Sequence, residues 1–211
     1  MKKQHDVRRF EPTSLLALIF VFAAAFAGSM TGFAKECGMI RDNTLRLHII
    51  ANSDSDEDQR LKLAVRDAIL GEYSAELAGG DKSDAMISAG RLLGRVEQTA
   101  NEALRLNGSW QTAKAELVRM YFPTKKYGSV TMPAGVYDAL RVRIGSASGK
   151  NWWCVMFPPL CLPAAMDDDE LDAELEHQFG AEGLDAIKKA DAPRYRVRFA
   201  LLELIESLFA H

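Results

Sequence analysis

The order of apolar and polar positions predicts one apolar helix followed by separate groups of strands and amphipathic helices. Leu15 to Ala27 is uninterrupted apolar sequence. Residues 44–51 alternate apolar and polar side chains, as a half-buried strand does. Two helices are expected next, and residues 113–122 and 135–144 then alternate again. Because helices and strands are grouped rather than interleaved, the pattern favours an α+β fold.

The expected architecture is a small mixed or antiparallel sheet packed against two long helices, plus a C-terminal amphipathic helix. The two long helices are predicted to end near residue 78 and residue 106, and each carries apolar side chains at helical spacing. Residues 44–165 are expected to form the signalling domain, and residues 166–211 an acidic and amphipathic helical region. The final helix has an apolar stripe that includes Val197, Leu201, Leu204 and Leu208. Such a stripe more often packs on its own domain than on a partner.

Residues 1–34 have the features of an export segment. Four basic side chains precede the apolar run: Lys2, Lys3, Arg8 and Arg9. Small residues follow the run, which is typical of a signal peptide with cleavage sites after Ala27 or Ala34. The run alone is short for a membrane span, but residues 13–34 together are long enough for a retained anchor. Both interpretations stay open, and residues 35–43 are expected to be a linker.

Composition and charge argue against nucleic acid as a partner. The 211 residues are 48% hydrophobic and 26% charged, which is ordinary for a globular protein. The formal net charge is −3 for the whole chain and −5 once residues 1–34 are left out. Nucleic-acid binding needs a basic surface, and so does tethering to anionic lipid by charge. We therefore expect neither.

The sequence offers little for catalysis. No serine-hydrolase, zinc-protease, P-loop or dinucleotide-binding motif occurs. The carboxylates of Asp54, Asp56 and Asp58 fit the start of a helix better than a metal site. We expect no cofactor, no metal ion and no small-molecule substrate. The alternative is an exported thiol hydrolase in which Cys154 is the nucleophile and His48 the base.

Residues 151–162 are the most unusual stretch of the chain. Adjacent tryptophans on a strand point to opposite faces, so Trp152 and Trp153 cannot both enter one core. Two successive prolines stiffen the segment, and a rigid aromatic segment makes a good contact surface. The alternative is that the segment only fills the core. The candidate partner-binding residues are Tyr127, Trp152, Trp153, Phe157, Pro158 and Pro159.

The chain has three cysteines. Cys154 and Cys161 are near enough in sequence to form a disulfide in an exported protein, which would leave Cys37 without a partner. A cysteine with a second cysteine nearby in an exported protein is more often structural than catalytic.

Several sequence blocks resemble the sporulation stage II protein R family and keep its order. They lie at residues 45–68, 122–128, 133–137 and 151–161. The last block, NWWCVMFPPLC, is improbable by chance. The resemblance covers about residues 41–162 and does not reach the final helix.

This resemblance implies an intercellular signal of endospore formation. Members of the family are made in the forespore and exported into the space between the two septal membranes. There they promote activation of a membrane-embedded aspartic protease, which processes the precursor of the mother-cell sigma factor. The resemblance implies no catalytic residue. It implies a protein that is secreted across the forespore membrane or anchored to it by residues 13–34.

Overall fold

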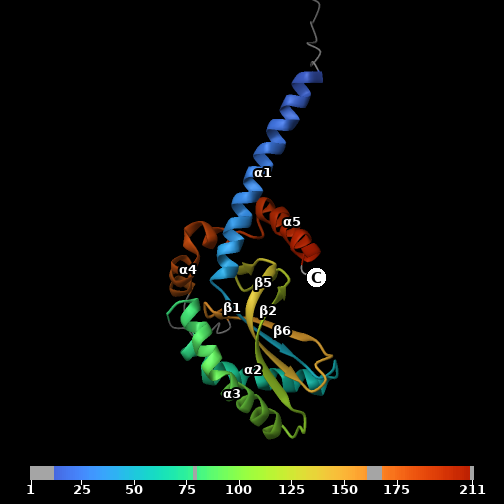
Figure 1. Ribbon diagram of the computed structural model, residues 1–211, viewed down its shortest axis with the longest axis vertical. Coiled ribbons are helices and arrows are strands. Elements are labelled where there is room, and N and C mark those ends of the chain that lie inside the picture. The colour runs from blue at the N-terminus through green and yellow to red at the C-terminus, as the bar shows by residue number, and fades with distance from the viewer. Residues whose placement is uncertain (1–11, 78–79, 161–167, 210–211) are drawn as a thin grey trace, which may run out of the picture.

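The computed structural model describes residues 12–77, 80–160 and 168–209, and it shows a head at one end of a long helix (Figure 1). That helix is α1 (Pro12–Asp42). The other elements are β1 (Leu45–Ile50), α2 (Asp56–Leu77), α3 (Lys82–Leu106), β2 (Ala113–Phe122), β3 (Lys125–Tyr127), β4 (Val130–Met132), β5 (Gly135–Ile144), β6 (Asn151–Phe157), α4 (Asp168–Lys188) and α5 (Pro193–Phe209).

The head is built around a four-stranded mixed sheet with the order β2-β5-β1-β6. Strand β1 is parallel to β5 and antiparallel to β6, and β2 is antiparallel to β5. Leu47 in the middle of β1 is paired with Leu140 on one side and with Cys154 on the other. The predicted α+β class with a small mixed sheet, two long helices and a C-terminal helix is confirmed. Residues 151–157 form the edge strand β6.

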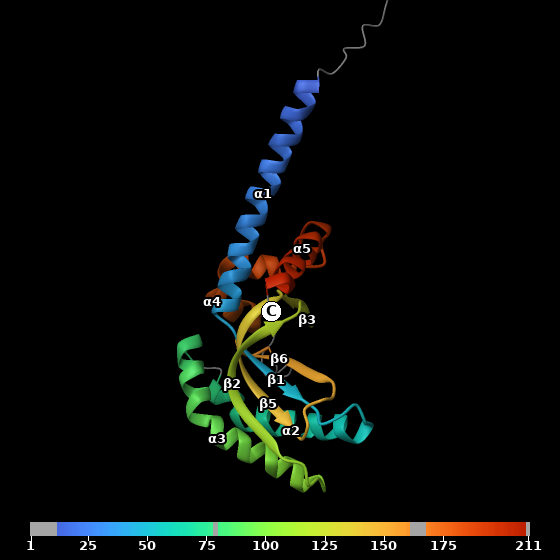
Figure 2. The same cartoon turned by 45° about the vertical axis from the view of Figure 1, so that its right-hand side comes forward.

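One face of the sheet packs against α2 and α3, which lie on the same side of the strands (Figure 2). The apolar side of β1 contributes Leu45, Leu47 and Ile49 to this first cluster, all fully buried. The helices contribute residues at helical spacing, so each presents one continuous apolar stripe. These are Leu61, Val65, Ile69 and Tyr73 from α2, and Ala85, Ala89, Leu92, Val96, Ala100 and Ala103 from α3.

The opposite face of the sheet is partly covered by α4, by the hairpin of β3 and β4, and by the end of α1. This second cluster includes Phe122 and Val155 from the sheet, Met132 from the hairpin, Phe179 from α4 and Ile40 from α1. Helix α4, which belongs to the predicted C-terminal region of residues 166–211, therefore packs on the sheet of the preceding residues.

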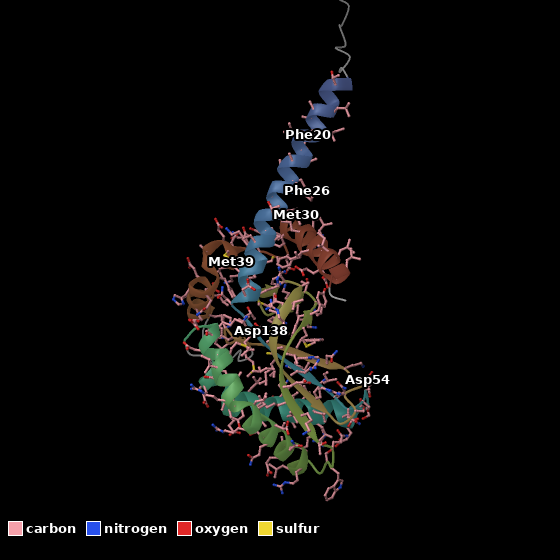
Figure 3. The ribbon with its side chains drawn as sticks, viewed as in Figure 1. Phe20, Phe26, Met30, Met39, Asp54 and Asp138 are labelled. Atoms are coloured by element: carbon pink, nitrogen blue, oxygen red, sulfur yellow. The ribbon has the colours of Figure 1, made fainter. Side chains whose placement is uncertain are left out.

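The loop after β1 is fixed to the loop before β6. Asn52 accepts a hydrogen bond from the Ser146 backbone at 2.9 Å, and Asp54 accepts one from the Lys150 backbone at 2.7 Å. Figure 3 shows Asp54 on the side of the head opposite α4. Gly149 lies so close to the Ser53 backbone that a Cβ atom at position 149 would be 2.1 Å from the Ser53 carbonyl oxygen. Only glycine fits such a contact without a backbone shift.

The carboxylate of Asp58, at the start of α2, is hydrogen-bonded to the same loop. Asp58 is 6% exposed and accepts hydrogen bonds from Asn52, Ser53 and the Gln111 side chain. These donors favour the charged form and lower the pKa of Asp58 to about 2. The prediction that Asp58 belongs to a helix start agrees with this arrangement, in which the Ser55 hydroxyl also caps the helix.

Helix α1 is exposed at one end and buried in the head at the other. Phe20 and Phe26 lie clear of the head (Figure 3), with exposed fractions of 74% and 54%. Further along the same helix, Phe33, Cys37 and Ile40 are at most 1% exposed. This spacing of four and three residues places the three side chains on one helix face. Residues 35–42 therefore continue the helix rather than form the expected linker.

The contact between α1 and α5 forms a third cluster. The ring of Phe33 lies 5.1 Å from the ring of Phe199, edge to face, and 6.1 Å from the ring of Tyr195. Arg41 and Glu206 form an ion pair of 3.0 Å between the same two helices. The buried face of α5 thus carries Tyr195, Phe199 and Leu202. The expected stripe of Val197, Leu204 and Leu208 lies on its exposed side instead.

Replacing Phe33 by Ala should destabilise the junction of α1 with the head, because it removes a fully buried ring and leaves a cavity. We expect a loss of about 3–5 kcal/mol in the free energy of unfolding. Urea unfolding of the full chain in detergent micelles measures this loss. The matched control is Phe26→Ala on the same helix, which should change stability by less than about 0.5 kcal/mol. Equal effects of the two substitutions would show that α1 does not pack into the head.

Candidate functional site

The second face of the sheet encloses a buried arginine. Arg46 of β1 is 0% exposed. Its guanidinium carbon lies 4.4 Å from the centre of the Phe122 ring, 4.9 Å from that of Tyr137 and 5.5 Å from that of Tyr127. The face of an aromatic ring attracts a cation through its quadrupole. The rings of β2, β3 and β5 therefore stabilise a positive charge that has no ion-pair partner among the described residues.

Hydrogen bonds orient the Arg46 guanidinium. Its Nε donates to the Cys154 carbonyl oxygen at 3.0 Å, and its Nη2 donates to the Tyr127 hydroxyl at 2.8 Å. Its Nη1 is buried and has no acceptor among the described residues. Burial raises the pKa of Tyr127 and of Tyr137, although the charge of Arg46 partly opposes this rise. Both phenols therefore stay protonated, so they are polar groups without a charge.

Beside this arginine, His48 and Trp153 form a stacked pair across β1 and β6. Their ring centres are 4.0 Å apart and their planes differ by 7°. The Phe122 ring lies edge-on to Trp153 at 4.8 Å. Atom Nε2 of His48 donates to the Asn151 side-chain oxygen at 2.9 Å. Burial lowers the pKa of His48, and the nearby Arg141 charge lowers it further, while the bond to Asn151 opposes both. His48 is therefore neutral at pH 7.

The residues of this arginine–aromatic site come from separate parts of the sequence. Each of the sequence blocks at residues 45–68, 122–128, 133–137 and 151–161 supplies at least one of them. The members are Arg46 and His48 from the first block, Phe122 and Tyr127 from the second, Tyr137 from the third and Trp153 from the last. The fold thus brings the blocks together around one buried charge.

The structure separates the sequence-predicted contact residues. Trp153 lies on the second face of the sheet, at the edge of the site, and is partly exposed. Trp152 points to the first face, as the alternation of a strand requires, where the Arg66 guanidinium covers its ring at 4.4 Å. Phe157 and Pro158 are buried, so they offer no contact surface. Tyr127 and Pro159 are partly exposed.

Sequence reasoning missed three members of the site, namely Arg46, Phe122 and Tyr137. The signal that was available is the alternation of β1, which puts Arg46 and His48 together on the face opposite its leucines. That face was interpreted as solvent-facing. An exposed tryptophan was missed too: Trp110, between α3 and β2, is 98% exposed.

The cysteines do not support thiol chemistry at this site. Cys154 is disulfide-bonded and 4% exposed, whereas Cys37 is free and buried. Cys161 lies outside the described residues, so its predicted pairing with Cys154 stays a prediction. Cys154 also belongs to the cluster on the first face, while His48 lies on the second face. A disulfide sulfur on the far side of the sheet cannot be activated by that histidine.

No group of His, Cys, Asp and Glu side chains that could hold a metal ion occurs within residues 12–77, 80–160 and 168–209. The site combines one buried cation, neutral phenols, a neutral imidazole and a partly exposed indole. It carries no carboxylate and no free thiol within these described parts. Its chemistry suits recognition of another molecule through shape and aromatic contact.

The structure defines an α+β domain carried on an N-terminal helix that is long and apolar enough to cross a membrane. Residues 41–167 match the family model described as stage II sporulation protein R. The stage II sporulation protein R of Bacillus subtilis strain 168 is 34% identical over 160 residues, covering 70% of each chain. The chain belongs to the stage II sporulation protein R family. No solved structure matches it.

The lowered pKa of His48 predicts a pH-dependent stability. The pKa of His48 is below 6.5 in the folded protein. The neutral imidazole therefore contributes fully to the free energy of unfolding above about pH 6.5, and this contribution is lost as pH falls through the pKa of the folded state. The urea midpoint should therefore decrease as pH falls from about 7.5 to about 5. His48→Gln, which does not titrate, should show a smaller decrease. The same pH dependence in both proteins would contradict a buried neutral His48.

Proposed function

We propose that this chain is a membrane-anchored signalling protein of endospore formation. It promotes activation of a membrane-embedded aspartic protease, and that protease then processes the precursor of the mother-cell sigma factor. The proposal rests on family membership over residues 41–167, a region that contains the whole arginine–aromatic site. The site offers a surface for a protein partner, and its members among the described residues include no carboxylate and no free thiol.

The charge around α1 supports an outward-facing head. Four basic side chains precede the apolar helix: Lys2, Lys3, Arg8 and Arg9. Basic residues next to a membrane-spanning segment remain on the cytoplasmic side. The head, which follows the helix, then lies across the membrane from the compartment of synthesis. Such a placement suits a signal that acts on a neighbouring cell.

Packing at the base of α1 supports a retained anchor. Cleavage after Ala34 would remove Phe33 from the third cluster, where its ring contacts Tyr195 and Phe199. Removal of a helix that supplies part of the core of the head would leave that core incomplete. The proposal is therefore that residues 13–34 stay attached and hold the head at the membrane surface.

The surface proposed to contact the protease is the exposed edge of the arginine–aromatic site. Trp153 is held flat against His48 and edge-on to Phe122, so its orientation is fixed before any partner binds. A rigid aromatic side chain loses little conformational entropy on binding, which makes it an effective contact residue. Buried Arg46 fixes the surrounding rings through its bonds to β6 and to Tyr127.

The alternative of an exported thiol hydrolase has no supporting observation. Its nucleophile would be Cys154, which is disulfide-bonded, and its base would be His48, on the other face of the sheet.

Trp153→Ala should abolish signalling. The assay is co-expression of the full chain with the sporulation protease and the sigma factor precursor, scored by cleavage of the precursor. The unsubstituted chain should give cleavage, and omission of the chain should give none. The Trp153→Ala chain should give at least about thirtyfold less cleavage, because a central aromatic contact typically contributes about 2 kcal/mol or more and each 1.4 kcal/mol is tenfold.

The matched control is Trp110→Ala, which removes a fully exposed tryptophan outside the sequence blocks and should leave cleavage unchanged. The urea midpoint of each variant separates loss of contact from loss of fold. Full cleavage with a folded Trp153→Ala chain would remove this surface from the interface.

A further inference from the structure

Helix α5 exposes an apolar stripe that the fold leaves uncovered. Its exposed fractions are 55% for Val197, 58% for Leu204, 48% for Ile205 and 69% for Leu208, and Leu201 beside them is partly exposed. These five positions follow the spacing of one helix face over three turns. A continuous row of exposed large aliphatic side chains on one helix face marks a contact surface.

The stripe is not needed to hold α5 on the head. Tyr195, Phe199 and Leu202 already pack the opposite side of the helix against α1 and α4. Glu206 is paired with Arg41 at 3.0 Å. Burial raises the pKa of the Tyr121 phenol in β2, and the nearby charges of Glu203 and Glu206 raise it further. The acidic side chains of α5 therefore turn toward the head, and its second apolar face turns away from it.

The position of α5 relative to α1 indicates what covers this stripe. Arg198 of α5 donates a hydrogen bond to the Ser29 hydroxyl of α1. Ser29 lies two residues after Ala27, the end of the uninterrupted apolar run of α1. Figures 1 and 2 both show α5 at the end of the head from which α1 projects. A bilayer that surrounds the apolar run of α1 would therefore have its surface beside α5.

We propose that α5 lies in the lipid–water interface of the bilayer that α1 enters, with its exposed stripe against the acyl chains. An amphipathic helix binds there by burying its apolar face at the boundary between headgroups and acyl chains. Arg196 at the start of the helix is exposed, and lipid phosphates would attract its positive charge. This inference rests on the proposed anchoring by α1 and adds a second attachment that orients the head.

The test uses the full chain reconstituted in phosphatidylethanolamine–phosphatidylglycerol vesicles. A single cysteine is introduced by Leu204→Cys, Leu106→Cys or Val21→Cys and labelled with an environment-sensitive fluorophore. Leu106 is 74% exposed at the end of α3, and Val21 is 62% exposed on α1. Cys37 is buried and Cys154 is disulfide-bonded, and the unsubstituted chain gives the labelling background. Lipids with a quencher near the headgroup end of the acyl chain are then compared with plain lipids.

The label at position 204 should lose about half of its fluorescence in the quencher lipids, as a group at the interface does. The label at position 106 should be unaffected, and the label at position 21 should also be quenched. Quenching at 21 without quenching at 204 would overturn the placement of α5 and leave the anchor intact.

Absence of quenching at both 204 and 21 would show that α1 is not in the bilayer, so the proposed anchoring would fail. An unquenched label at 204 whose emission shifts to the blue as protein density increases would show that a second copy covers the stripe. That result also overturns the lipid contact.

Discussion

Burial of one face of α1 in the head is the constraint on which the rest of the structure depends. Phe33, Cys37 and Ile40 join the helix to the head without an intervening linker. Because α1 is one continuous helix from Pro12 to Asp42, its buried end sets the direction of its exposed apolar end relative to the head. The same contact fixes α5 beside the apolar run and α4 over the second face of the sheet. In the proposed arrangement, the helix that attaches the protein to the membrane therefore also contributes side chains to the core of the head.

The buried Arg46 is the second organising feature, and stability alone does not explain it. A buried charge costs free energy unless it is compensated, and well-packed apolar side chains often replace buried ions without loss. Here the compensation comes from three aromatic rings and two hydrogen bonds, and one nitrogen has no acceptor among the described residues. Such an arrangement specifies one geometry of the rings. A recognition surface needs that kind of fixed geometry, because disordered contact residues lose entropy on binding.

Sequence patterns predicted the fold class, the strands β1, β2 and β5, and the opposite directions of Trp152 and Trp153, because these follow from local periodicity. The arginine–aromatic site was not predictable in the same way, since its rings come from strands far apart in the chain. Two local signals were misinterpreted. Residues 35–43 were expected to form a linker, although residues 33, 37 and 40 share one buried helix face. Helix α5 has two apolar faces, and periodicity alone does not say which one meets the head.

The proposed topology is tested most directly by proteolysis of intact spheroplasts that express the full chain, followed by separation of the membrane fraction. An outward-facing head on a retained α1 predicts that protease added outside digests the head, and that untreated full-length chain remains with the membranes after an alkaline wash. A head that is protected in intact spheroplasts, and digested only after they are lysed, would contradict both the exported location and the signalling role.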